Sequence, residues 1–235
     1  MLWFRAWLET RSRIVFTLVW LSFFVGVLAM AGTGGGAPGN TPVGRLLAMM
    51  AFPWIFVPVW LAGSGVRTQP VFGRNATRGV HGSTHFTLSL PVTRARLLMV
   101  RGALGLLETA AVTLVSGAAA WMLFPIVRAA STPMLGMQHL LVVFMCGLAF
   151  YGLSVLMSTW LDEMWHIWST TILILVLWAP PVRRLLPPAF DIFRPLVDMS
   201  PLITHTLPWT AMAVSLVAGG VFVVAALHIV KTREY

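Results

Sequence analysis

Residues 82–108 read G-S-T-H-F-T-L-S-L-P-V-T-R-A-R-L-L-M-V-R-G-A-L-G-L-L-E and begin with a short segment between a glycine and a proline. Gly82 and Pro91 leave room for about two helical turns between them. Ser83 or Thr84 can cap the start of this helix, because a hydroxyl accepts hydrogen bonds from unpaired backbone N–H groups. Pro91 ends it, since the proline ring blocks the preceding turn. The segment therefore predicts a short helix.

A basic cluster and a long apolar run follow in the same stretch. Arg94, Arg96 and Arg101 come first, and mostly apolar sequence then continues to Phe124. Basic residues are typical of the ends of membrane helices, where their charge stays in water. The pattern predicts a helix at a membrane surface, a basic hinge, and a second helix that descends into the lipid.

The composition of the whole chain supports a membrane location. Of 235 residues, 58% are hydrophobic and only 10% are charged, whereas a soluble domain has about 25% charged residues. The net charge of +9 does not indicate nucleic-acid binding, because the basic residues lie at the ends of apolar runs. We therefore expect most of the surface to face lipid and no nucleic-acid partner.

Six apolar runs are long enough to cross a bilayer. They cover about 14–31, 46–65, 97–124, 138–159, 165–181 and 207–230. We expect an all-α integral membrane protein in which residues 1–235 form a single transmembrane domain of six helices. Pro53 and Pro58 lie inside the second run, which predicts a bent helix there.

The first residues form an amphipathic pattern at about 100° per residue. One face holds Trp3, Phe4, Trp7, Leu8, Ile14 and Val15, and the other holds Arg5, Glu9, Ser12 and Arg13. The pattern predicts an interfacial helix over about 2–13, with aromatic side chains in the headgroups and basic ones toward water. An ordinary basic flank with chance tryptophan positions is the alternative.

The distribution of basic residues predicts the topology. An even number of spans puts both termini on one side of the membrane. That side holds most of the basic residues, because it includes Arg67, Arg74, Arg78, Arg94 and Arg96 in the loop over 66–96. Loops rich in Lys and Arg stay in the cytoplasm. We therefore expect both termini to be cytoplasmic.

Three strings resemble a known family. S-L-P-V-T-R-A-R-L at 89–97 is similar to the segment before the third membrane helix of ABC-2 type permeases, the membrane subunits of type-2 ABC exporters. W-L-E-T-R-S-R at 7–13 and K-T-R-E-Y at 231–235 are similar to that family too. The resemblance implies an elbow helix over 2–13 on the cytoplasmic leaflet, six spans, and a location in the cytoplasmic (inner) membrane of a bacterium.

The resemblance also implies partners and the sites that contact them. Two permease subunits, alike or different, would pair, and each would bind one cytoplasmic ABC ATPase through a coupling helix. By resemblance the residues that couple to the ATPase are Ser83, Thr84, Phe86, Leu88, Leu90, Pro91, Arg94 and Arg96. Asp162 and Glu163, in the short link after the fourth span, are either a second contact or a solvated turn. The proline-rich residues 182–206 would form an external gate region.

The chain has no ATPase site of its own. A P-loop needs G-x-x-x-x-G-K-[ST], and the single lysine, Lys231, follows Val230. If ATP drives transport, the ATP and Mg²⁺ bind to the partner subunit, so we expect no cofactor in this chain and no enzyme activity. His81 and His85 have the i,i+4 spacing of metal ligands, but no carboxylate or cysteine accompanies them, and we expect no metal site.

Glu108 is the most informative charged residue, because it lies about eleven residues into the third expected span. A carboxylate near the middle of the bilayer costs about 2.5–3.5 kcal/mol and is a candidate for function. Arg101 lies seven residues earlier, nearly on the same face, and close enough to the helix end to extend to the interface. The pair would either line a transport pathway or make structural contacts to a neighbouring helix. A stand-alone secondary transporter or channel that uses Glu108 as a proton or ion site is the alternative function.

Overall fold

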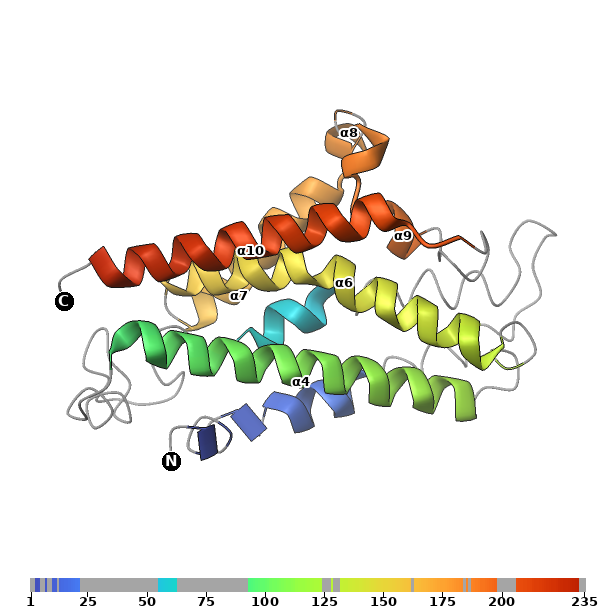
Figure 1. Cartoon of the computed structure of the whole chain (residues 1–235), viewed down its shortest axis with the longest axis horizontal. Coiled ribbons are helices and arrows are strands. Elements are labelled where there is room, and N and C mark those ends of the chain that lie inside the picture. The colour runs from blue at the N-terminus through green and yellow to red at the C-terminus, as the bar shows by residue number, and fades with distance from the viewer. Residues whose placement is uncertain are drawn as a thin grey trace.

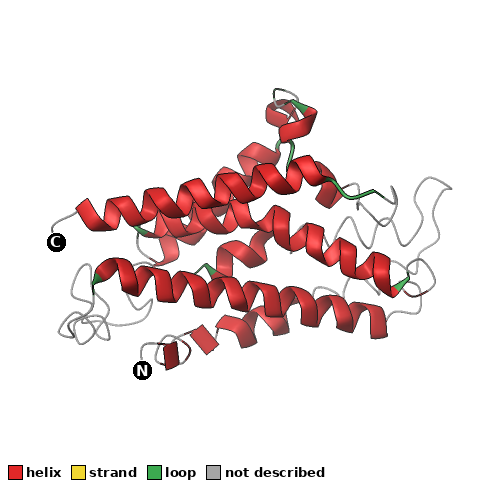
Figure 2. Cartoon of the chain, viewed as in Figure 1, coloured by secondary structure: helices red, strands yellow, loops and turns green. Residues whose placement is uncertain are grey.

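A computed structural model describes the chain in several ranges: residues 3, 4, 7, 10, 11, 13–21, 55–62, 93–123, 128, 132–161, 163–183, 185, 187–197 and 206–232. Every regular element in these ranges is a helix, and no strand occurs among them (Figure 2). The all-α fold class is therefore confirmed for the part of the chain that the structure describes.

Within the described ranges, three helices are long and apolar enough to cross a membrane. They are α4 (Arg94–Leu123), α6 (Pro133–Ser158) and α10 (Trp209–Thr232), and they lie side by side along the long axis of the molecule (Figure 1). They lie where the third, fourth and sixth expected spans fall. The structure thus supports a membrane protein with three candidate spans, and the count of six stays a prediction.

The fifth expected span, 165–181, is shorter as a helix than predicted. α7 (Glu163–Trp178) has 16 residues, which is about 24 Å at 1.5 Å per residue. A bilayer core is about 30 Å thick. After α7 the chain forms three short helices, α8 (Pro180–Arg183), η1 (Pro188–Phe190) and α9 (Arg194–Val197). α8 projects from the side of the bundle (Figure 1).

The first two expected spans are only partly described. Residues 13–21 and 55–61 are helical, and they lie next to each other, because the Phe16 and Trp60 rings stack with centroids 5.4 Å apart. Helical residues at 3, 4, 7, 10 and 11 fall within the expected elbow helix, whose remaining positions lie outside the described residues. The expected coupling helix at 83–90 lies outside them entirely.

α6 begins five residues before the expected start at 138, and its N-terminus explains the difference. The Thr132 hydroxyl accepts a hydrogen bond from the Leu135 N–H at 3.3 Å, which caps the helix. Pro133 follows at the first helical position, where a missing N–H has no consequence. A proline that indicates a loop in the sequence is here the first residue of the helix.

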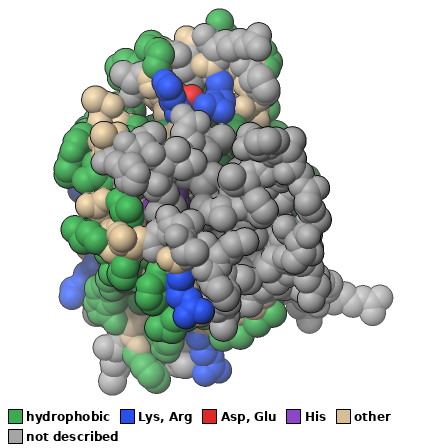
Figure 3. All heavy atoms as spheres, turned by 90° about the vertical axis from the view of Figure 1, so that its right-hand side faces the viewer, with side chains coloured by type: hydrophobic (Ala, Val, Ile, Leu, Met, Phe, Trp, Pro, Cys, Tyr) green, Lys and Arg blue, Asp and Glu red, His purple; other side chains and the backbone are tan. Residues whose placement is uncertain are grey.

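The described surface is apolar and much of the polar content is inside. Large apolar side chains are exposed along every long helix, including Leu107, Leu114, Leu141, Ile172, Val217, Val221 and Val224. Figure 3 shows hydrophobic side chains on the described part of one face, together with several Lys and Arg side chains. Buried polar side chains include Thr10, Arg101, Glu108, Thr109, Thr113, Ser154, His166, Thr170 and Ser215. This distribution suits a surface covered by lipid and not by water.

α6 and α10 pack closely through small residues. A Cβ on Gly152 of α6 would lie 2.5 Å from the Gly219 carbonyl oxygen of α10, so the two backbones almost touch. The Ser215 hydroxyl of α10 donates to the Cys146 carbonyl at 2.8 Å and accepts from the Ala149 N–H at 3.0 Å. Small residues and interhelical hydrogen bonds are the usual means of helix association in lipid.

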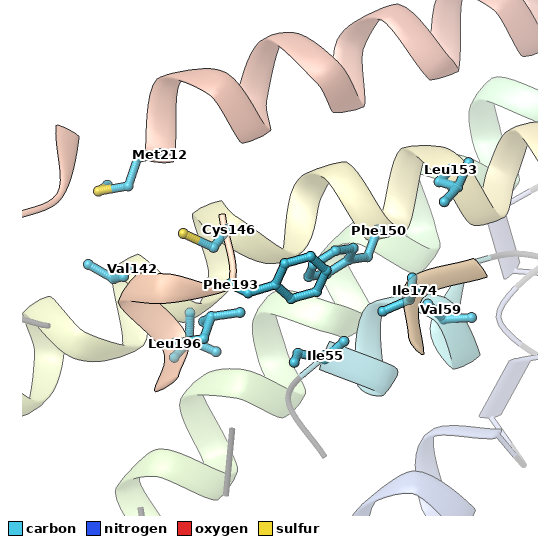
Figure 4. Close-up of a cluster of buried hydrophobic side chains, with 11 residues drawn as sticks. Ile55, Val59, Val142, Cys146, Phe150, Leu153, Ile174, Phe193, Leu196 and Met212 are labelled. Carbon is cyan, nitrogen blue, oxygen red and sulfur yellow. The ribbon is translucent and has the colours of Figure 1, made fainter. Parts of the chain in front are cut away.

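The largest buried cluster joins α6 to α7, α9, α10 and residues 55–61. Its members are Ile55, Val59, Val142, Val143, Cys146, Phe150, Leu153, Ile174, Phe193, Leu196 and Met212 (Figure 4). Two residues of this cluster, Phe193 and Leu196, come from the short segment after α7. Part of this segment therefore packs inside the bundle.

Candidate functional site

Glu108 lies inside the bundle and makes a hydrogen bond to the N-terminal helix. Its side chain is 3% exposed. The Thr10 hydroxyl, also buried, donates to Glu108 Oε1. Glu108 Oε2 is buried and has no hydrogen-bond partner within the described ranges. One carboxylate oxygen therefore joins two helices that are 98 residues apart in sequence, and the other oxygen is left as an acceptor.

Arg13 interacts electrostatically with Glu108. It lies about one turn after Thr10, and its guanidinium attracts the Glu108 carboxylate. Arg13 is half-buried. The expectation that Arg13 faces water is therefore wrong: the face of this helix that carries Thr10, Arg13 and Thr17 turns toward the bundle. Trp3, Phe4 and Trp7 are exposed, as expected for the lipid-facing side.

Arg101 is also inside, at 6% exposed. It lies seven residues before Glu108 on α4, about 10 Å along the helix axis. The expectation that its side chain extends to an exposed interface is wrong. Its position on the same buried side of α4 as Glu108 agrees with the sequence pattern.

Three hydroxyls extend the polar side of α4 beyond Glu108. Thr109 donates to the Gly105 carbonyl at 2.8 Å, Thr113 donates to the Thr109 carbonyl at 2.8 Å, and Ser116 donates to the Val112 carbonyl. Each hydroxyl has one hydrogen, so after this bond only its acceptor lone pairs remain for other contacts. α4 therefore has a polar stripe that begins at Arg101 and continues past Glu108.

The two interpretations of Glu108 can be compared with this geometry. The structural interpretation requires a hydrogen bond to a neighbouring helix, and Thr10 provides one. The transport interpretation requires a group that can change its partner, and Oε2 is an acceptor in a mostly apolar interior. The arrangement can hold two helices together and can accept a proton or a hydrogen-bond donor.

The residues expected to couple to an ATPase lie mostly outside the described ranges. Ser83, Thr84, Phe86, Leu88, Leu90 and Pro91 are all in that group. Arg94 and Arg96 are the first and third residues of α4, and the Arg96 side chain is exposed. Both arginines belong to the helix itself, so the basic hinge expected at these positions is instead the first turn of α4.

Of the two residues expected to form a second contact, only one has a described backbone. Asp162 lies outside the described residues, and Glu163 is the first residue of α7. A carboxylate at a helix N-terminus is favourable because of the positive end of the helix dipole. This placement is consistent with a solvated turn and equally with a partner contact.

A second group of charged residues was not among the expected site residues. Asp191 Oδ2 accepts hydrogen bonds from Arg183 Nη2 at 2.7 Å and Nε at 3.0 Å. Asp191 Oδ1 accepts from the backbone N–H groups of Phe193 at 3.0 Å and Arg194 at 3.2 Å. The sequence contained one sign of this group: Asp191 lies three residues before Arg194, and an aspartate at that spacing often caps a turn.

The part of the chain that the structure describes contains no group of three or more His, Cys, Asp or Glu side chains that could hold a metal ion. Comparisons with protein-family models, with curated proteins and with solved structures find no match.

Proposed function

We propose that this chain is the membrane-spanning permease subunit of an ATP-driven ABC exporter. A separate ATPase subunit hydrolyses ATP, and this chain couples the hydrolysis to movement of a substrate across the bilayer. Three membrane-length helices in the described ranges, an apolar surface, and buried polar side chains such as Arg101 and Glu108 support a transport protein. The resemblance of residues 89–97 to ABC-2 type permeases supports this class of transporter in particular.

The observation that carries the proposal is that residues 89–97, which resemble ABC-2 type permeases, overlap the start of α4. α4 begins at Arg94, within these residues, and continues without interruption to Leu123. A force applied to residues 83–90 by a partner therefore has only three residues to cross before it reaches a rigid helix. α4 also carries Glu108, whose bond to Thr10 connects α4 to the N-terminal helix.

The proposal includes partners and a location. Each permease binds one cytoplasmic ABC ATPase that holds ATP and Mg²⁺, and two permeases pair as a homodimer or heterodimer. The complex resides in the cytoplasmic membrane with both termini of this chain in the cytoplasm. We propose no cofactor or catalytic residue within the chain.

The test is purification of the chain from its native membrane, followed by identification of bound proteins and measurement of ATP hydrolysis. We expect an ABC ATPase in near-equal amount. Phe86→Asp should weaken ATPase binding, since a buried aromatic anchor contributes about 2 kcal/mol or more at an interface. The control is Trp209→Asp, which also replaces an aromatic ring with aspartate, at the exposed first residue of α10. If Phe86→Asp retains the ATPase and full coupled hydrolysis, the coupling assignment is wrong.

The burial of Glu108 favours one second candidate, a stand-alone transporter that uses Glu108 as a proton or ion site. Oε2 is an acceptor in the interior of the bundle and could bind a proton or a cation. The same purification distinguishes the two functions. A stand-alone transporter would be isolated without an ATPase, and an ion gradient alone would drive transport in vesicles. That transport would be lost in Glu108→Gln.

A further inference from the structure

The segment between α7 and α10 places two apolar side chains inside the bundle. Phe193 is 2% exposed and Leu196 is 3% exposed. The Phe193 ring lies against the Phe150 ring of α6, with centroids 5.2 Å apart and planes at 32°. Figure 4 shows the two rings among side chains from α6, α7, α10 and residues 55–61. We call Phe193 and Leu196 the plug.

The plug is held by very little secondary structure. α9 has four residues, and an isolated helix of this length is not stable in itself. Its first N–H groups depend on Asp191 Oδ1, which accepts from Phe193 and Arg194. The position of the plug therefore depends on Asp191 and on the burial of its own side chains.

Asp191 is fixed in turn by Arg183. Two guanidinium nitrogens, Nε and Nη2, donate to the same oxygen, Oδ2. The backbone N–H of Arg183 donates to the Ala179 carbonyl at 3.0 Å, directly after the end of α7. The ion pair thus connects the end of α7 to the cap of α9 and closes the chain between residues 183 and 191. Charge-assisted bonds of this kind are among the stronger ones in proteins.

We propose that the Arg183–Asp191 ion pair is a latch that keeps the plug in the bundle, and that its release opens an apolar recess in which Cys146 becomes accessible. The side chains around the plug are apolar or weakly polar, among them Ile55, Val142, Cys146, Ile174 and Met212. A charged group would lose its hydration there without a partner. The recess therefore admits apolar groups, such as a hydrocarbon chain or an uncharged reagent.

This inference goes beyond the proposed function and does not depend on an ATPase. The latch and the plug are contacts within one chain, so their release can be measured without nucleotide or partner. Failure of the latch would leave the coupling assignment of residues 83–91 untouched, and the converse also holds.

The chain provides its own reporter, because Cys146 is its single cysteine and is 0% exposed. The experiment measures the rate at which an uncharged maleimide modifies Cys146 in the full-length protein in membranes. Arg183→Ala removes the guanidinium. Asp191→Asn removes the charge but keeps an oxygen that can cap α9. We expect each variant to react on the order of tenfold faster than the wild type, as for the loss of a bond to a charged group. The double variant should react no faster than the faster single variant.

Two controls keep the result specific. Arg128→Ala removes an exposed arginine between α4 and α6 and should leave the rate unchanged. A cationic thiol reagent should remain slow in the latch variants, since the recess is apolar. Wild-type rates in both Arg183→Ala and Asp191→Asn would overturn the latch. Equal acceleration with the cationic reagent would overturn the apolar recess, because it would mean that the bundle itself has opened to water.

Discussion

The bond from Thr10 to Glu108 joins two buried side chains of the N-terminal half. It satisfies one oxygen of a carboxylate that is far from water, and it connects residues of two different helices. A buried acceptor that loses its donor costs about 1–3 kcal/mol. The stability of the bundle should therefore respond to a change at Thr10 more than to changes at the exposed residues beside it.

Thr10→Val tests this at nearly constant side-chain volume. The variant removes the donor and should lower Tm, because each kcal/mol corresponds to roughly 2–4 °C in a chain of this length. Thr10→Ser keeps the hydroxyl and should melt close to the wild type. Thermal unfolding in detergent measures both. Equal Tm values for the Val and Ser variants would mean that the bond does not stabilise the bundle.

Glu108→Gln separates the transport role from the structural one. The amide keeps the shape of the side chain and an oxygen that can accept the Thr10 hydrogen bond, but it removes the charge. We expect normal assembly on gel filtration and altered transport in reconstituted vesicles. Transport at the wild-type level would leave only the structural role for Glu108.

At the scale of elements, α6 and α10 lie so close together that their backbones are in contact. A Cβ at Gly219 would lie 2.5 Å from the Leu148 carbonyl oxygen, whereas one at the next residue, Gly220, would meet nothing within 4 Å. Gly219 is thus crowded and its neighbour Gly220 is not, so substitution of each glycine by alanine can be compared within one helix.

Gly219→Ala should destabilise the protein by about 1–3 kcal/mol, the range for overpacked interiors. Gly220→Ala should have no such cost and gains helix propensity of up to about 1 kcal/mol. Thermal unfolding of the two variants in the same detergent measures the difference. If Gly219→Ala is as stable as Gly220→Ala, the helices are not in close contact at this point.

The elements that the sequence predicted best are those with long apolar runs. α6 contains no Asp, Glu, Lys or Arg, α10 contains Lys231 near its end, and the four charged residues of α4 lie in its first half. Hydropathy therefore locates the three helices without knowledge of their neighbours. The ends were less accurate, because Pro133 can either break a helix or begin one, and only the cap at Thr132 distinguishes these cases. α7 ends at Trp178, before the two prolines that the expected span included.

The sequence indicated where Glu108 lies along its helix, but it did not indicate which residues Glu108 contacts. The depth of Glu108 along α4 follows from counting residues. Its contact with Thr10 depends on how two helices pack, and no local pattern contains that information. The helical wheel placed Arg13 toward water because it contains one helix alone and cannot show the attraction between Arg13 and Glu108 of α4. The Arg183–Asp191 pair joins residues eight positions apart across several short elements, so no single helical wheel contains it.

At the scale of the whole molecule, the topology is testable with single cysteines. In a background with Cys146 replaced by Ala, a cysteine at Gly36 or Phe190 should react with an impermeant reagent added outside the cell. A cysteine at Asn75 or Tyr235 should react only after the membrane is permeabilised, because the positive-inside rule puts both in the cytoplasm. Labelling of position 75 from outside would contradict the six-span topology.

The short α7 has a consequence for the lipid around the protein. A helix of 16 residues that packs against α6, which has 26 residues, cannot match the same hydrocarbon thickness. Hydrophobic mismatch of this kind is relieved when the bilayer thins locally or when shorter acyl chains collect beside the short helix. The membrane beside α7 would then be deformed even when no substrate is being transported. Lipids there would be more easily displaced than those around α4 or α10.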